Sequence, residues 1–199
     1  MRLFSWFGRG LSRKEGKQSE AGNNDFQNTA APVTFDSAMQ VSAFWASTRL
    51  LTETVAAMPL ESFITLDDAK QVDRDYDLWY LMNYKPNRYQ TRNEFFENIM
   101  LNLVTNGNAY CAIERGARGN VISLLPLMSS QMCVSLAEDG SVLYEYQDAN
   151  HTVKFYAEES MLHIKLFGNG LIGLSPLSHA AKSLGVAIAA ENRVSVLAK

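Results

Sequence analysis

The segment "PNRYQTRNEFFENIMLNLVTNGNAY", residues 86–110, constrains the fold more than any other part of the chain. Thr91 and Glu94 have the spacing of a capping box, in which the threonine oxygen accepts from the Glu94 amide and the carboxylate reaches back to the Thr91 amide. Gly107 is placed to be the left-handed residue that ends the helix. A helix is therefore predicted between Thr91 and Gly107. One face of it is apolar and consists of Phe95, Phe96, Ile99, Met100 and Leu103.

The chain after this helix has the pattern of antiparallel strands. "AYCAIER" (109–115) and "VISLLPL" (121–127) are predicted as strands joined across "GARGN". Further hairpin-connected strands are predicted in "QMCVSL", "SVLYEYQ", "TVKFYA" and "MLHIKLF", with Asp139-Gly140 as a turn. A helix follows from Pro176 onward. The predicted fold class is α+β, with helices first, then an antiparallel strand-rich region and a C-terminal helix.

Before residue 86 the pattern predicts two helices around a strand. Asp36 or Ser37 is predicted to cap the first helix, which ends before Pro59. Its apolar positions repeat at three and four and predict one core-facing side, made of Val41, Phe44, Leu51, Val55 and Met58. "LESFITL" is then predicted as a strand and "DDAKQ" as a polar turn. "DYDLWYLMNY" is predicted as a short helix stopped by Lys85-Pro86.

Charge is distributed unevenly along the chain. Residues 1–20 hold five Lys/Arg and two Asp/Glu, so this arm carries a net charge of +3. The other residues hold 13 Lys/Arg and 19 Asp/Glu and carry a net charge of −6. A nucleic-acid reader normally shows a clustered basic face, which this body lacks. The basic arm is either a solvated tail or a transient contact for DNA or a partner. With the Ala/Gly/Asn-rich linker after it, the arm is predicted to be flexible over residues 1–34.

The composition predicts a folded protein with a buried core and shows neither a membrane span nor a secretory signal. Apolar residues make up 47% and charged residues 20% of the 199 positions, and a chain of this size buries roughly 70% of its unfolded surface. No run approaches the ~20 apolar residues of a membrane span, and the start lacks a secretory signal, so a cytoplasmic protein is predicted. Cys111 and Cys133 are predicted as buried free thiols. His151, His163 and His179 show no metal-ligand spacing, so no metal site is predicted.

The stretch "FGNGLIGLSP", residues 167–176, contains G-x-G-x-x-G and raises the question of a nucleotide site. A dinucleotide fold needs this motif at the end of the first strand of a βαβ unit, and no such unit is predicted here. A phosphate loop would need a lysine where Leu174 stands. We therefore interpret the glycines as a strand-to-helix turn, with Ser175 as the helix cap and Pro176 in the first turn. No cofactor is predicted.

A catalytic site is not predicted either. Ser175, His163 and Asp148 could be assembled into a nominal triad, but their places in separate strands and loops give no reason for them to meet. No catalytic residue is therefore assigned, and the chain is predicted not to be an enzyme.

Four short motifs, in order and spacing, resemble the portal proteins of tailed double-stranded DNA phages. They are "PNRYQT" (86–91), "GNAY" (107–110), "GNVISLLPL" (119–127) and "GLSPL" (173–177), preceded by a helix before "MPL" (58–60). The resemblance extends over most of the chain after the arm. Its motif residues that we single out are Pro86, Asn87, Thr91, Glu94, Gly107, Asn108, Tyr110, Gly173, Ser175 and Pro176.

The resemblance implies a subunit of a homo-oligomeric ring, usually a dodecamer, at one vertex of the capsid. Double-stranded DNA passes through such a ring without sequence specificity during packaging and ejection. The implied protein partners are the terminase large subunit, which carries the ATP chemistry, the major capsid protein and a head-tail adaptor. The implied location is the virion, and the host cytoplasm during assembly. Residues 35–199 would form the wing-like α+β domain of the subunit.

Portal proteins of this kind are usually about twice as long as this chain. We therefore expect a fragment or a truncated prophage remnant, whose last helix would continue into stem segments, and which would not close a ring by itself. A generic capsid assembly or scaffold protein is the alternative, because likeness of fold does not establish function.

Overall fold

The structure, a computed structural model, describes residues 33–66 and 69–197. The chain divides into two units, Met1–Ala30 and Ala31–Lys199, and all described residues belong to the second. Apart from residues 33 and 34, the predicted basic arm and linker lie outside the described residues.

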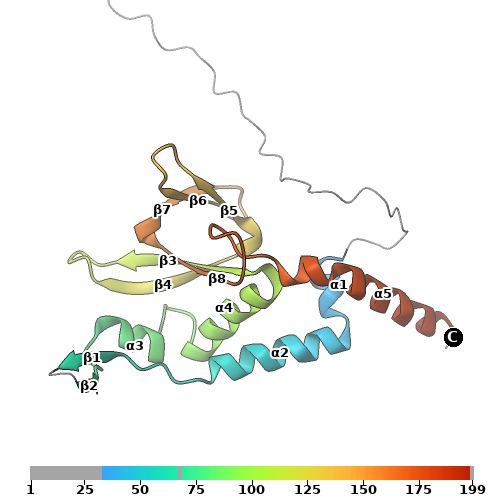
Figure 1. Ribbon diagram of the computed structural model, residues 1–199, viewed down its shortest axis with the longest axis horizontal. Coiled ribbons are helices and arrows are strands. Elements are labelled where there is room, and N and C mark those ends of the chain that lie inside the picture. Colours follow the sequence, from blue (N-terminus) through green and yellow to red (C-terminus); the bar gives the residue numbers. More distant parts are fainter. Residues whose placement is uncertain (1–32, 67–68, 198–199) are drawn as a thin grey trace, which may run out of the picture. The chain divides into compact units, whose positions relative to one another are not determined.

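Helices come first and strands follow, as Figure 1 shows. The first half contains α1 (Phe35–Met39), α2 (Ser42–Ala56), β1 (Phe63–Leu66), β2 (Ala69–Val72), α3 (Asp77–Asn83) and α4 (Arg92–Asn106). The second half contains β3 (Asn108–Arg115), β4 (Val121–Leu127), β5 (Met132–Leu136), β6 (Val142–Gln147), β7 (Val153–Ala157), β8 (Met161–Lys165) and α5 (Pro176–Leu197). Two short 3-10 turns, Ser129–Gln131 and Glu158–Ser160, separate β4 from β5 and β7 from β8. The predicted α+β class is confirmed.

A central antiparallel sheet in the order β4-β3-β8 forms the middle layer. Successive side chains of a strand point to opposite faces. Ala109 and Cys111 of β3 therefore pack under α4, whereas Tyr110 packs against Tyr144 of the second sheet, which has the order β5-β6-β7. The central sheet thus lies between α4 and the second sheet (Figure 1). Burial on both faces explains the nearly continuous apolar sequence of β3.

A separate apolar cluster joins the two ends of the described region. Ala38, Val41 and Leu184 are its buried members, with Leu177 and Ile188 of α5 packed around them. The first half of α5 therefore packs against α1 and Val41. Further along, Leu197 is 86% exposed.

The prediction of one continuous first helix capped at Asp36 or Ser37 is wrong. Thr34 caps α1 through a capping box with Ser37, so the helix begins earlier than predicted. The helix then breaks because Val41 takes an extended conformation (φ −75°, ψ 113°) and is buried with Leu184. Packing against a residue far along the chain overrides the local helical pattern.

The predicted core face of this helix is only partly correct. Val41 is buried and Phe44 and Val55 are half-buried. Leu51 and Met58, however, are 51% and 53% exposed, and the small side chains of Thr48, Thr52 and Ala56 are buried instead. Arg92 of α4 explains why this side of α2 is buried. Its guanidinium donates to the carbonyl oxygens of Ala56 and Met58 and holds the end of α2 beside α4. Small side chains allow the two helices to approach closely.

Three further differences concern strands. Part of "DDAKQ" forms β2, which pairs with β1 through Leu66 and Ala69, rather than a turn. β8 pairs with β3 and not with β7, the strand before it. Cys111 is a buried free thiol as predicted, but Cys133 is exposed, because it lies on the outer side of β5.

Candidate functional site

The motif residues "GNAY" and "GLSPL", far apart in the sequence, meet at one place. We call this place the Asn108 junction and define it by Thr105, Gly107, Asn108, Gly173 and Ser175. The Asn108 side chain, 8% exposed, accepts from the Gly173 amide at 2.7 Å and donates to the Gly173 carbonyl at 2.9 Å. The Ser175 hydroxyl donates to the Thr105 carbonyl at 2.8 Å. Side chains thus fasten the start of α5 to the end of α4.

The backbones at the junction approach too closely for any side chain other than that of glycine. Gly107 has φ 74°, and a Cβ atom there would lie 2.0 Å from the Leu174 carbonyl oxygen. A Cβ atom on Gly173 would lie 2.1 Å from the Gly107 carbonyl oxygen. That carbonyl also accepts from the Leu166 amide at 2.9 Å. The left-handed helix end predicted at Gly107 is confirmed, and the close approach is a second reason for glycine.

Ser175 is also the helix cap predicted from the sequence. Its oxygen accepts from the Ser178 amide at 3.2 Å, and α5 begins at Pro176. One hydroxyl group therefore both starts α5 and bonds the last turn of α4.

Five of the seven backbone amides of the glycine loop, from Gly168 to Leu174, donate to acceptors within the chain. The Asn169 side chain accepts from the amides of Leu171 and Ile172 at 3.0 and 2.9 Å. The amides of Asn169 and Leu174 donate to carbonyls within the loop, and the Gly173 amide donates to Asn108. A phosphate-binding loop needs such amides pointing at the ligand. The geometry supports the interpretation of this segment as a strand-to-helix turn.

His163 of β8 extends the junction toward the second sheet. Its Nε2 lies 3.1 Å from Asn108 Oδ1, and its Nδ1 lies 3.3 Å from the Tyr144 hydroxyl. Because an amide oxygen can only accept, Nε2 carries the proton and Nδ1 accepts from Tyr144. The ring stacks on Tyr110 with centroids 4.3 Å apart. Burial, with a smaller contribution from Lys165, lowers the pKa of His163 to about 4.

This pKa gives a pH dependence of stability. Since the folded pKa lies below the ordinary value of 6.5, the unfolded chain binds a proton that the folded chain does not between these two values. We expect the free energy of unfolding to fall as pH decreases from 6.5 toward 4. The expected loss is on the order of 1 kcal/mol after allowance for solvent screening of a half-buried group. Urea unfolding at several pH values would measure it. A His163→Gln variant, which keeps a donor for Asn108, should lack this component; an equal pH dependence in both chains would contradict the assignment.

In the motif "PNRYQT" a second buried asparagine, Asn87, connects segments of the chain through hydrogen bonds, at the edge of the central sheet. Asn87 is 4% exposed and donates to the Leu124 carbonyl of β4 at 3.0 Å, while its oxygen accepts from the Gln90 amide at 2.9 Å. The Pro86 carbonyl accepts from the Leu124 amide at 2.8 Å. This loop therefore fixes the start of α4 against β4.

The predicted capping box of α4 is confirmed. The Glu94 carboxylate accepts from the Thr91 amide at 2.7 Å, and the Glu94 amide donates to the Thr91 hydroxyl at 3.4 Å. These hydrogen bonds lower the pKa of Glu94.

A Thr91→Ala substitution removes the hydroxyl acceptor and should destabilise the chain by about 1 kcal/mol. Urea unfolding followed by circular dichroism would measure the change. Thr91→Ser keeps the acceptor and is the matched control, expected to stay near the wild type. Equal midpoints for the alanine, serine and wild-type chains would show that the cap does not stabilise α4.

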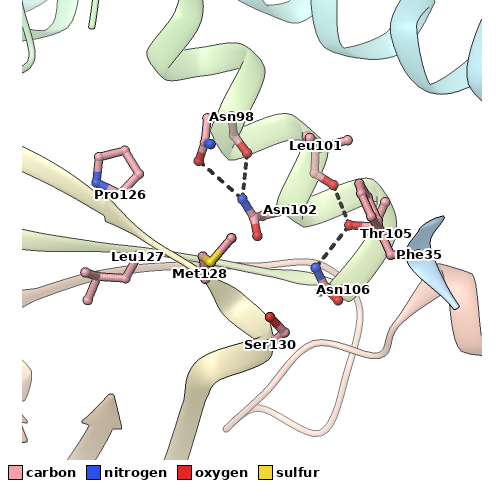
Figure 2. Close-up of a pocket in the computed structure, with 10 residues that line it drawn as sticks. All are labelled: Phe35, Asn98, Leu101, Asn102, Thr105, Asn106, Pro126, Leu127, Met128 and Ser130. Carbon is pink, nitrogen blue, oxygen red and sulfur yellow. Dashed lines mark hydrogen bonds between the residues drawn. The ribbon is translucent and has the colours of Figure 1, made fainter. Parts of the chain in front are cut away.

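A cavity of about 270 Å³ lies between α4 and the end of β4 (Figure 2). Asn98, Asn102 and Asn106 face it from successive turns of α4, and Phe35 and Met128 line it from other segments. Asn102 donates to Asn98, and Asn106 donates to Thr105. None of the ten lining side chains titrates, so this cavity offers no acid, base or charged ligand for chemistry.

The three residues of the nominal triad have different partners. Ser175 bonds Thr105, His163 bonds Asn108 and Tyr144, and Asp148 accepts from the amides of Asn150 and Thr152 at 2.8 and 2.9 Å. Within residues 33–66 and 69–197 there is no group of three His, Cys, Asp or Glu side chains able to hold a metal ion. In that same part of the chain, no helix is both long and apolar enough to cross a membrane.

The junction residue Thr105 and its neighbour His163 were not predicted from the sequence to belong to this site. His163 sits in an apolar strand and has no ligand spacing, and Thr105 is an ordinary helical position with 1% exposure. One indication of their role was present in the sequence: a histidine and a threonine stand at positions where an apolar residue is expected. A polar side chain at such a position is usually buried with a hydrogen-bond partner. Tyr110, singled out for its motif, stacks on His163 and packs under the second sheet.

The polar residues of the Asn108 junction connect segments of the chain that lie far apart in the sequence. A model of the family "phage portal protein" matches residues 42–199. The chain therefore belongs to the phage portal protein family, a structural family.

Two curated relatives agree with this assignment. The chain is 37% identical over 197 residues to the portal protein of Enterobacteria phage HK97, covering 96% of this chain and 46% of that protein. It is 30% identical over 169 residues to the probable portal protein of Streptomyces phage phiC31, covering 80% of this chain and 36% of that protein. The chain thus spans less than half the length of these two relatives.

Solved structures show the same fold. A chain from the neck of an empty gene transfer agent (GTA) particle, computed with C6 symmetry, matches with a TM-score of 0.71 and 25% identity, covering 85% of this chain and 48% of the other. A chain from the neck of the native GTA particle, computed with C12 symmetry, matches with a TM-score of 0.64 and 26% identity, covering 84% of this chain and 47% of the other.

Proposed function

We propose that this chain is part of a portal subunit that forms a homo-oligomeric ring, twelve-fold in its usual state, at a single vertex of a phage capsid. Double-stranded DNA would pass through the ring without sequence specificity during packaging and ejection. The observation that carries the proposal is membership of the portal family, together with the fold shared with chains from GTA necks computed with C6 and C12 symmetry.

The proposal includes the wing-like role of residues 35–199 and the partners that a portal ring contacts. These partners are the terminase large subunit, the major capsid protein and a head-tail adaptor, with the protein in the virion and, during assembly, in the host cytoplasm. In this role the motif residues are structural: Asn87 and Asn108 fix the helices to the central sheet. We propose no catalytic residue and no cofactor.

The charge of the body supports passage of DNA better than tight binding. Residues 21–199 hold 13 Lys/Arg and 19 Asp/Glu, a balance of −6. Each phosphate neutralised by a Lys or Arg adds salt-dependent affinity. An acidic surface avoids such contacts and lets the duplex slide.

Immunogold labelling of purified phage particles would test the location. A portal subunit is expected at one vertex, at the neck. Gold distributed over the whole shell would indicate a general capsid scaffold instead, and particles without label would contradict a role in the virion.

A further inference from the structure

α3 and the loop after it carry an exposed surface rich in tyrosine. Tyr76, Tyr80 and Tyr84 are 52%, 57% and 58% exposed, and the rings of Tyr80 and Tyr84 stack with centroids 5.4 Å apart. Together with Arg74, Lys85 and Arg88 they form the tyrosine patch. All of these residues except Tyr84 line an open cavity of about 640 Å³. Exposed side chains of these types are typical of protein interfaces, where Tyr and Arg contribute most of the binding energy.

The tyrosine patch is basic on an acidic body. Its cavity is lined by three cations, Arg74, Lys85 and Arg88, and by two carboxylates, Asp75 and Glu114, a balance of +1. A duplex site needs several unopposed cations, because affinity comes from neutralising many phosphates. The patch therefore favours an acidic protein surface over DNA.

The second sheet and its turns form an acidic segment, and one face of this sheet carries exposed apolar side chains beside Glu145. The register places Cys133, Glu145 and Phe155 side by side on the face turned away from Tyr144. Phe155 is 63% and Val153 is 42% exposed. Residues 132–160 hold one Lys and six Asp/Glu, a balance of −5. We call Cys133, Glu145, Val153 and Phe155 the outer sheet face.

The two surfaces belong to opposite layers of the molecule. Met82 of α3 packs on the cluster beneath α4, on one side of the central sheet. Tyr144 of the second sheet packs on the other side, so the outer sheet face points away from the central sheet (Figure 1). Different patches on opposite sides suit a head-to-tail contact, which closes into a ring when the rotation allows it.

We propose that the tyrosine patch of one copy of this chain docks on the outer sheet face of the next copy. This inference rests on the proposed ring and names the surfaces that join its subunits. Lys85 and Arg88 would lie near Glu145, and the tyrosine rings would cover Phe155 and Val153. The opposite charges would orient the encounter, and the buried aromatic area would hold it.

Disulfide trapping between two single-site chains tests the contact. One chain carries Lys85→Cys with Cys133→Ser; the other keeps Cys133 and is otherwise unchanged. Cys111, present in both, is buried and its pKa is raised to about 12, so it stays an unreactive thiol. After mixing and mild oxidation, we expect a mixed dimer on a non-reducing gel. The control chain carries Val186→Cys and Cys133→Ser. Val186 is 68% exposed on α5 and belongs to neither surface, so its cysteine is accessible but should not meet Cys133. We expect the Lys85→Cys chain to form the mixed dimer at least ten-fold faster than this control. Equal rates would overturn the proposal.

Charge reversal gives a second readout. Adding Arg88→Glu to the Lys85→Cys chain should slow the trapping several-fold, and Glu145→Lys in the other chain should restore it. Absence of this rescue would overturn the charge pairing. A short DNA duplex should leave the trapping rate unchanged; protection of the introduced cysteine by the duplex, lost at high salt, would assign the patch to nucleic acid and overturn the proposal.

Trapping and ring formation are separate observations. Rings of the full-length protein without the cross-link would overturn the assignment of surfaces and leave the portal function standing. A specific cross-link without rings would support the contact and contradict the proposed ring.

Discussion

A Gly107→Val chain is expected to lose at least about 4 kcal/mol of folding free energy, a large part of the 5–15 kcal/mol of an ordinary domain. Gly107 has φ 74°, a conformation in which a β-branched residue is strained. Its Cβ would also lie 2.0 Å from the Leu174 carbonyl oxygen, so the turn that starts α5 would have to move. Urea unfolding followed by circular dichroism would measure the loss.

Gly140→Val is the matched control. Gly140 has φ 84°, but a Cβ there meets nothing within 4 Å. This substitution therefore reports backbone strain without a clash, roughly 1–3 kcal/mol. If the two valine variants lost equal stability, close packing at the Asn108 junction would play no part.

An Asn108→Leu substitution is expected to cost roughly 3–5 kcal/mol. It removes the partner of the Gly173 amide and of the Gly173 carbonyl, and it leaves His163 without its acceptor. A buried polar group without a partner costs about 1–3 kcal/mol. Chemical unfolding gives the total, and hydrogen exchange at the amides of Gly173 and Ser178 should become faster, because the start of α5 is released.

Asn102→Leu on the same helix provides the comparison. Asn102 is half-buried; it donates to Asn98, one turn away, and its oxygen accepts a long hydrogen bond of 3.5 Å from the Ser129 amide. We expect a change below about 1 kcal/mol. An Asn108 variant that is no less stable than the Asn102 variant would contradict the role of the junction.

Local signals predicted α4 and its caps correctly. Thr91, Glu94 and Gly107 act within one turn of their own positions, so a capping box and a left-handed helix end are visible in the sequence. Ser175 was predicted as the cap of α5 for the same reason.

Features set by distant contacts were not predictable in this way. The break between α1 and α2 depends on Val41 packing with Leu184, and the buried side of α2 depends on Arg92. Cys133 lies in an apolar strand, and only the packing of Tyr144 on Tyr110 decides which side of its sheet is outside. Apolar patterns within a short strand do not contain that information.

The Asn108 junction shows the same limit. Both motifs were recognised, but their contact arises because β8 pairs with β3, with Asn108 opposite Lys165. That pairing brings the glycine loop beside the end of α4. The sequence pattern favoured a hairpin with β7, since neighbouring strands usually pair. His163 enters the junction through this long-range pairing.

Electron microscopy of the full-length portal subunit, of which we propose that this chain is a part, would test the proposed function most directly. If the protein is a portal subunit, purified particles should be uniform rings with an axial hole, and class averages should show one repeated subunit, twelve per ring in the usual state. A protein that stays monomeric at all concentrations, or that assembles only into shells or open filaments without an axial hole, would contradict it.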